Sequence, residues 1–131
     1  MAQLNCIVVT PEKTAVESAA DFIVLPLYDG EIGIAAGRAP LIGRLGFGEM
    51  RLTLGDKVTR YYLDGGFVQV AGNVVSVLTN RAMPSGDVDG QAAHRQLDQA
   101  LKQSIATPEL EAIRDRSIAQ ARAQIRVANR A

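Results

Sequence analysis

The feature that most constrains the fold is an abrupt change in residue pattern about two thirds of the way along the chain. Ten of the twelve glycines lie between Gly30 and Gly72, where short apolar and β-branched runs alternate with turn sequences. After the segment Pro84-Ser85-Gly86-Asp87, glycine almost disappears, and the helix-compatible residues Ala, Gln and Arg dominate. The sequence therefore predicts a β-rich domain over residues 1–85 and a helical domain over residues 86–131, joined by a hinge.

Seven runs in the first part have the composition of β-strands. They are bounded by turn sequences such as Asp29-Gly30 and Gly72-Asn73. The expected strands cover residues 4–10, 21–26, 31–35, 50–54, 58–63, 67–71 and 74–79. Because Asp64-Gly65-Gly66 is also a good turn sequence, the runs on either side of it are expected to be separate strands. Short strands at this spacing are typical of a sandwich or a barrel and not of βαβ units.

The second part has the periodicity of two helices. Thr107-Pro108-Glu109 is a strong start signal, because it combines a capping residue, a proline at the first helical position and an acidic residue in the first turn. The first helix is expected to share one face among Ala93, Leu97, Ala100, Leu101 and Ile105. The second is expected to share one face among Leu110, Ile113, Ala121, Ile125 and Ala128. The short loop between them predicts an antiparallel two-helix hairpin, and the whole chain an α+β protein.

The residues that carry most enzyme and metal chemistry are nearly missing. With one histidine and one cysteine, the chain lacks the ligands of an ordinary zinc site. His94 is interpreted as a solvated helix residue and Cys6 as a small core residue. Glycines 43, 46 and 48 have the wrong order for a dinucleotide fingerprint, and no Gly-Lys-Ser/Thr sequence follows them. We therefore expect no catalytic, cofactor-binding or metal-binding residues.

Charge and hydropathy exclude two further classes of partner. The 14 basic and 14 acidic residues give a net charge of zero, which argues against general nucleic-acid binding. No apolar run approaches the roughly 20 residues that span a bilayer, and residues 1–10 lack the pattern of a signal peptide. A soluble, cytosolic chain that meets a membrane only through its partners is expected. The residues from Arg114 onward include five arginines and one aspartate, which gives this tail a net charge of +4. The rest of the chain therefore has a net charge of −4.

Composition and periodicity alone predict a β-sandwich followed by a helical hairpin. They indicate an interaction protein but do not identify its partner. Two alternatives remain open at this point. One is a free-standing β-sandwich binding module whose hairpin serves dimerisation. The other is a small enzyme with a site built from aspartates and arginines.

Three stretches of the chain narrow these alternatives. They are Val-Val-Thr-Pro-Glu at residues 8–12, the sequence Asp-Gly-Glu-Ile-Gly-Ile-Ala-Ala-Gly-Arg-Ala-Pro-Leu-Ile at residues 29–42, and the hairpin sequence at residues 64–78. The middle stretch is similar to the pattern Gly-Glu-x-Gly-Ile-x-x-Gly-His-Ala-Pro-Leu. In this order and spacing, over about residues 4–80, the chain resembles the epsilon subunit family of bacterial F-type ATP synthases.

The resemblance implies a fold, a function and a location. The fold would be a sandwich of about ten antiparallel strands followed by the two-helix hairpin. The function would be that of a non-catalytic central-stalk, or rotor, subunit that links the gamma subunit to the ring of c subunits. Its hairpin would reach the alpha/beta catalytic head and inhibit ATP hydrolysis, in a complex that makes ATP from a gradient of protons or sodium ions. The complex would place the chain at the cytoplasmic face of the bacterial inner membrane.

The resemblance also implies three groups of contact residues. The c-ring interface would comprise Asp29, Gly30, Glu31, Ile32 and Gly33, with Glu31 beside glycines at a turn. The gamma interface would comprise Arg38, Ala39, Pro40 and Leu41. In the extended, inhibitory state of the hairpin, Arg122 and Arg126 would pair with an acidic loop of the beta subunits; the alternative is a solvated arginine face.

Two departures from the family pattern limit what the resemblance implies. Arg38 stands where the family usually has histidine, which adds a permanent charge at the expected gamma contact. Some members bind ATP in the hairpin through the pattern Ile/Leu-Asp-x-x-Arg-Ala. Here residues 88–93 read Val-Asp-Gly-Gln-Ala-Ala, so the arginine is replaced by Ala92. A triphosphate site without that cation is poorly supported, and we expect no or weak ATP binding.

Overall fold

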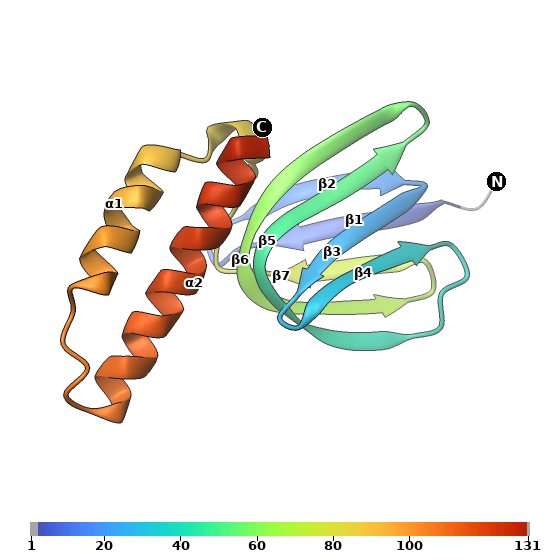
Figure 1. Cartoon of the computed structure of the whole chain (residues 1–131). Coiled ribbons are helices and arrows are strands. Elements are labelled where there is room, and N and C mark those ends of the chain that lie inside the picture. Colours follow the sequence, from blue (N-terminus) through green and yellow to red (C-terminus); the bar gives the residue numbers. More distant parts are fainter. Residues whose placement is uncertain (1–2, 131) are drawn as a thin grey trace. The chain divides into compact units, whose positions relative to one another are not determined.

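The computed structural model describes residues 3–130, and contacts divide the chain into two compact units at the Ser85/Gly86 boundary. The strands are β1 (Leu4–Val9), β2 (Thr14–Ala20), β3 (Phe22–Leu27), β4 (Gly30–Ala35), β5 (Leu41–Leu54), β6 (Lys57–Ala71), β7 (Val74–Leu78) and β8 (Ala82–Pro84). The helices are η1 (Ser85–Asp87), α1 (Gly90–Leu101) and α2 (Pro108–Arg130). Figure 1 shows them in chain order. Neither α1 nor α2 has the length and apolar character that crossing a membrane requires.

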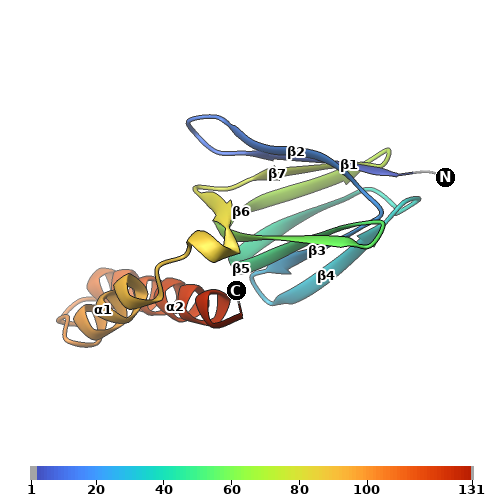
Figure 2. The same ribbon diagram turned by 90° about the horizontal axis from the view of Figure 1, so that it is seen from above.

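The first unit is a two-layered sandwich made from one continuously hydrogen-bonded sheet. The strand order is β2-β1-β7-β6-β5-β3-β4, and β8 pairs with β6 beside this path. The pairs are antiparallel except β1 with β7, which run parallel. Figure 2 shows β2, β1 and β7 in one layer and β3 and β4 in the other. The predicted fold class is confirmed, with eight strands among the described residues where about ten were expected.

Strands β5 and β6 belong to both layers, which accounts for part of the lower strand count. The two strands pair with each other from Leu41↔Val70 to Leu54↔Lys57. The predicted turn at Asp64-Gly65-Gly66 is therefore wrong, because these residues lie within one 15-residue strand. Gly65 and Gly66 have φ values of 75° and 111°, which bend the strand without ending it.

The core lies between the two layers. Inward positions alternate along the strands, as in Leu4, Cys6 and Val8 of β1. The buried core residues are Leu4, Cys6, Val8, Val16, Ala20, Ile23, Leu25, Ile34, Leu45, Met50, Leu52, Leu63, Val68, Val70, Val75 and Val77. All strands except β8 contribute to it. The interpretation of Cys6 as a core residue is confirmed.

The second unit is an antiparallel helical hairpin with capped ends. Helix α2 begins at Pro108, as predicted, and the Leu110 N–H donates to Thr107 Oγ1 at 3.1 Å. Helix α1 is capped by Asp89, whose Oδ1 accepts from the Ala92 N–H at 3.0 Å. Between the helices, Gln96 Nε2 donates to the Ser117 carbonyl at 3.1 Å. These contacts give the hairpin a polar seam in addition to its small-residue packing.

The predicted apolar faces of the helices are correct only in part. Ala93, Ala100 and Ala121 are buried as expected. The four residues expected in the same faces but exposed are Leu101, Ile105, Leu110 and Ile113. Helix α1 ends at Leu101, so these four lie at the loop end of the hairpin. The apolar pattern at that end is therefore not matched by burial.

Candidate partner-docking surface

The outer side of the layer that contains β1 and β7 carries several exposed apolar side chains, with Gln69 and Ser76 between them. Register places Phe67 of β6 beside Leu78 of β7, and Leu78 beside Val9 of β1. Further along, β5 contributes Ile42 and β7 contributes Val74 to the same side. We call this set, Val9, Ile42, Phe67, Val74 and Leu78, the apolar face. All five side chains are exposed, with Ile42, Phe67 and Leu78 exposed by 77%, 60% and 59%.

Apolar side chains that cluster on a protein surface often mark an interaction site, whereas single exposed apolar residues are common and need no explanation. The face spans four adjacent strands, so its side chains are held at fixed spacing by the ladder. The sequence analysis did not assign these residues to a contact surface, although all five lie in the stretches at residues 8–12, 29–42 and 64–78. The signal was present, because runs such as residues 67–71 and 74–78 are apolar at positions that point to both sides of the sheet.

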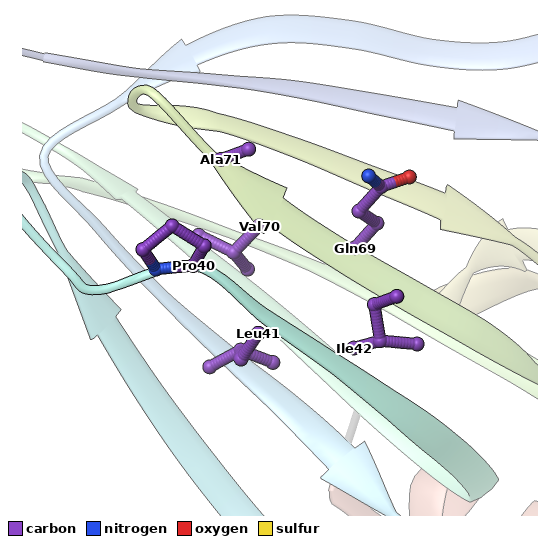
Figure 3. Close-up of a pocket in the computed structure, with 6 residues that line it drawn as sticks. All are labelled: Pro40, Leu41, Ile42, Gln69, Val70 and Ala71. Carbon is purple, nitrogen blue, oxygen red and sulfur yellow. The ribbon is translucent and has the colours of Figure 1, made fainter.

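A shallow depression lies next to Ile42, where β5 begins. Its volume is about 370 Å³, and its lining comes from two segments: residues 40–42 and residues 69–71. Figure 3 shows the side chains of Pro40, Leu41 and Ile42 beside those of Gln69, Val70 and Ala71. Two of the predicted gamma-contact residues, Pro40 and Leu41, thus line the same depression as Ile42, although the Leu41 side chain packs against the core.

The loop that carries Arg38 and Ala39 connects β4 to β5 and is exposed. The guanidinium of Arg38 does not project freely into solvent, because its Nη1 donates to the Gly33 carbonyl at 3.4 Å. At the base of the loop, the Gly37 N–H donates to Asn73 Oδ1 at 2.8 Å. The predicted gamma segment is thus attached both to β4 and to the β6–β7 turn.

The predicted c-ring segment forms the β3–β4 hairpin. Tyr28 and Asp29 make the turn, and β4 begins at Gly30. Glu31 lies in the strand, not in the turn, and pairs with Pro26. Its carboxylate forms an ion pair with Arg51 of β5 at 3.5 Å. Asp29, Gly30 and Glu31 are exposed, whereas Ile32 and Gly33 are partly buried.

An aromatic residue that the sequence reasoning passed over lies at the same turn. Tyr28 is exposed, and the guanidinium carbon of Arg44 lies 5.2 Å from the centre of its ring. This distance is within the range of a cation–π contact. The contact fixes the Tyr28 ring over β5 and gives the hairpin tip a rigid, partly apolar edge.

Arg122 and Arg126 lie on an exposed side of α2, four residues apart. Within residues 3–130 neither guanidinium forms an ion pair. Because like charges at this spacing repel by a few tenths of a kcal/mol, an acidic partner would be favoured there. The structure thus leaves both interpretations of this stripe open, the partner contact and the solvated face.

Groups that could hold a metal or act as a nucleophile do not assemble in the described part of the chain. No cluster of three His, Cys, Asp or Glu residues has the geometry of a metal site in residues 3–130. Burial raises the pKa of the Cys6 thiol from its ordinary 9.0 to about 12, so the thiol stays protonated and unreactive. The side chains gathered at the surface are suited to contact with another protein rather than to chemistry.

Fold and surface together define a class: an interaction subunit made of a β-sandwich and a helical hairpin. Residues 3–85 match the family model described as "ATP synthase, Delta/Epsilon chain, beta-sandwich domain". An ATP synthase epsilon chain of Rhodopirellula baltica is 47% identical, over 94% of this chain and 96% of that protein. One of Rubrobacter xylanophilus is 33% identical, over 83% of this chain and 75% of that protein. The chain belongs to the epsilon-chain family of ATP synthase, whose members are non-catalytic subunits of the rotary complex.

Solved structures agree on the fold. A chain of the Euglena gracilis mitochondrial ATP synthase, in a structure described as OSCP/F1/c-ring, has a TM-score of 0.82 at 20% identity. The alignment covers 94% of this chain and 79% of that chain. A chain of the Tetrahymena thermophila mitochondrial enzyme, from its central stalk and c-ring, has a TM-score of 0.76 at 13% identity, covering 97% of both.

Proposed function

We propose that the chain is the central-stalk subunit that links gamma to the c-ring, and that its hairpin restrains ATP hydrolysis. The observation that carries the proposal is the apolar face, five exposed side chains held on four adjacent strands. The family relationship supplies the complex in which this surface is covered. The chain performs no chemistry of its own and needs no cofactor in this role.

Gamma is proposed to cover the apolar face together with Arg38, Ala39, Pro40 and Leu41. Two observations support this assignment. Pro40 and Leu41 line the depression beside Ile42, so the end of the loop lies next to the face. Full burial of Ile42 and Phe67 would contribute about 1.5–3 kcal/mol each toward the cost of association. Arg38 lies at the rim, where a charge affects recognition more than affinity.

The c-ring is proposed to contact the β3–β4 hairpin, at Asp29, Gly30, Glu31, Ile32 and Gly33. The hairpin tip is exposed and carries Asp29, and the exposed Glu31 follows in β4 beside Arg51; such a polar edge suits polar loops of a ring. Tyr28, held by Arg44, extends this contact with an apolar edge. In this arrangement the chain reaches the bacterial inner membrane from its cytoplasmic side, through the ring and not through its own residues.

Arg122 and Arg126 are proposed to pair with an acidic loop of the beta subunits when the hairpin extends into the catalytic head. Their exposure and the absence of ion pairs to them within residues 3–130 support this assignment. ATP is not proposed as a ligand of the hairpin. The carboxylate of Asp89, the acidic residue of the family's ATP motif, caps α1 here, and Ala92 supplies no cation.

The decisive experiment is a titration of an epsilon-depleted catalytic head that contains gamma. The full-length chain and a version ending at Gly86 are compared for binding and for their effect on ATP hydrolysis. Binding of both, with inhibition by the full-length chain alone, is the expected result and assigns the anchor to the sandwich and the brake to the hairpin. Binding without inhibition would contradict the regulatory part. Absence of binding would favour a free-standing binding module.

A further inference from the structure

Asn73 connects three separate segments of the sandwich. It lies in the β6–β7 turn, where its carbonyl oxygen accepts from the Asn5 N–H of β1 at 2.9 Å. Its side-chain Oδ1 accepts from the Gly37 N–H at 2.8 Å, across 36 residues of sequence. The β4–β5 loop and the β6–β7 turn are therefore joined at one end of the apolar face, next to Ala71 and Val74.

The loop has little else to hold it. Arg38 N donates to the Ala35 carbonyl at 3.3 Å, and the Arg38 guanidinium reaches only to Gly33, so both bonds return to β4. Among the hydrogen bonds found in residues 3–130, the bond from Gly37 to Asn73 is the one that ties the loop to another turn. Pairing with β6 resumes only at Leu41.

The position makes two demands that asparagine meets together. Asn73 has a φ of 65° and is the one non-glycine residue with positive φ in the described chain. Asparagine and aspartate tolerate this left-handed conformation better than other residues with a side chain. Glycine would also adopt it, but it offers no acceptor to the Gly37 amide.

We infer that Asn73 is a positioning residue for partner docking: its amide oxygen fixes the Arg38–Leu41 loop in the conformation that gamma recognises. The inference rests on the proposed gamma contact and names a residue outside that contact. A loop that is ordered before binding loses less conformational freedom on association, which raises affinity without adding a contact. Asn73 therefore acts through the Gly37 amide, at the end of the apolar face.

Three variants of the full-length chain test this role. Asn73→Gly keeps the backbone conformation and removes the acceptor, whereas Asn73→Asp keeps both. Asp21→Ala is the matched control, because Asp21 Oδ2 accepts from the Gly55 N–H at 2.7 Å in the same way at a turn outside the docking surface. Two quantities are measured: amide hydrogen exchange at Gly37 and Gly55, and the dissociation constant for the gamma-containing, epsilon-depleted catalytic head.

Asn73→Gly is expected to speed exchange at Gly37 and to raise the dissociation constant, each about three- to tenfold, the size of one lost hydrogen bond. Asn73→Asp is expected to stay within about twofold of the wild type, and Asp21→Ala to change exchange at Gly55 alone. If Gly37 exchanges faster but affinity is unchanged, or affinity falls while Gly37 is unchanged, the positioning role is overturned. Failure of the wild-type chain to bind would instead overturn the proposed function, and the positioning role with it.

Discussion

Glu49 and Arg60 are joined across β5 and β6 by a hydrogen bond of 2.9 Å between Oε1 and Nη1. The Glu49 side chain is only 1% exposed, and its second oxygen accepts from Ser85 Oγ at 3.1 Å. A carboxylate in such a position needs its partners, because the charge has little water to solvate it.

Removing Arg60 is therefore expected to destabilise the sandwich. Arg60→Ala should lower the free energy of unfolding by about 1–3 kcal/mol, less than a fully buried pair would lose, because Arg60 is 46% exposed and Arg51 lies 3.8 Å from the same carboxylate. Urea denaturation measures the change. Asp115→Ala, which removes an exposed pair with Arg114, is the control and should cost less than about 0.5 kcal/mol. Equal effects of the two variants would contradict the prediction.

The apolar face can be separated from fold stability. Ile42→Asp should weaken binding to the gamma-containing head by at least about tenfold, because an apolar contact is lost and a charge is buried. The free energy of unfolding should change by less than about 0.5 kcal/mol, since Ile42 is exposed. Val58→Asp changes an exposed apolar residue of β6 outside the face and is the control. Similar losses of affinity in both variants would argue against a specific surface.

Gly66 is predicted to be irreplaceable in the bend of β6. A Cβ there would overlap the carbonyl oxygen of Leu78, and φ is 111°. Gly55 has a φ of 59°, but a Cβ added to it would meet no atom within 4 Å. Gly55→Ala should cost about 1–2 kcal/mol from the left-handed backbone alone, and Gly66→Ala at least about 2 kcal/mol more. Thermal denaturation compares them, and a stable Gly66→Ala variant would show that the two layers need no such bend.

The arginine stripe can be tested by reversing its charge. The double variant Arg122→Glu/Arg126→Glu should lose most of the inhibition of ATP hydrolysis, because each pair with an acidic loop becomes a repulsion. Binding through the sandwich should persist. Arg95→Glu, at an exposed position of α1, is the matched control. Unchanged inhibition in the double variant would leave the stripe as a solvated face.

Cys6 gives the stability of the sandwich a pH dependence. The folded thiol has a pKa of about 12, against an ordinary 9.0, so the unfolded chain releases this proton first as the pH rises. The titration of this thiol therefore leaves the free energy of unfolding unchanged below pH 9. Between pH 9 and about 12 the free energy of unfolding falls by up to about 1.4 kcal/mol per pH unit, because the unfolded chain is deprotonated and the folded chain is not. Comparison with Cys6→Ala isolates it: the variant should be less stable at every pH because a buried sulfur is lost, but its stability should lack this additional slope against pH. Parallel slopes would mean that the thiol is accessible in the native state.

The elements with strong local signals could be predicted from the sequence. Thr107-Pro108 starts α2 because a cap and a proline act locally. Gly65-Gly66 could not be interpreted correctly, because glycine serves a turn and a bend equally well, and the difference is decided by the neighbouring strand β5. Strand β2 was missed since Thr14–Ala20 contains three alanines and is formed by pairing with β1.

The candidate docking surface was predictable only where it coincides with the motif at residues 38–41. The apolar face combines residues from four strands, and its existence depends on register. Asn73 was visible as a turn residue, but its bond to Gly37 spans 36 residues and has no local signature.

The parallel pairing of β1 with β7 has a consequence for synthesis of the chain. Asn5 lies opposite Val74, so β1 meets its parallel neighbour only after about seventy further residues have been synthesised. The β1–β2 hairpin can form early, because Thr10 and Lys13 close a short turn between them. Until β7 emerges, one backbone edge of β1 remains unpaired and open to wrong partners. The free edge of β1 can therefore be covered only after β7 has been synthesised.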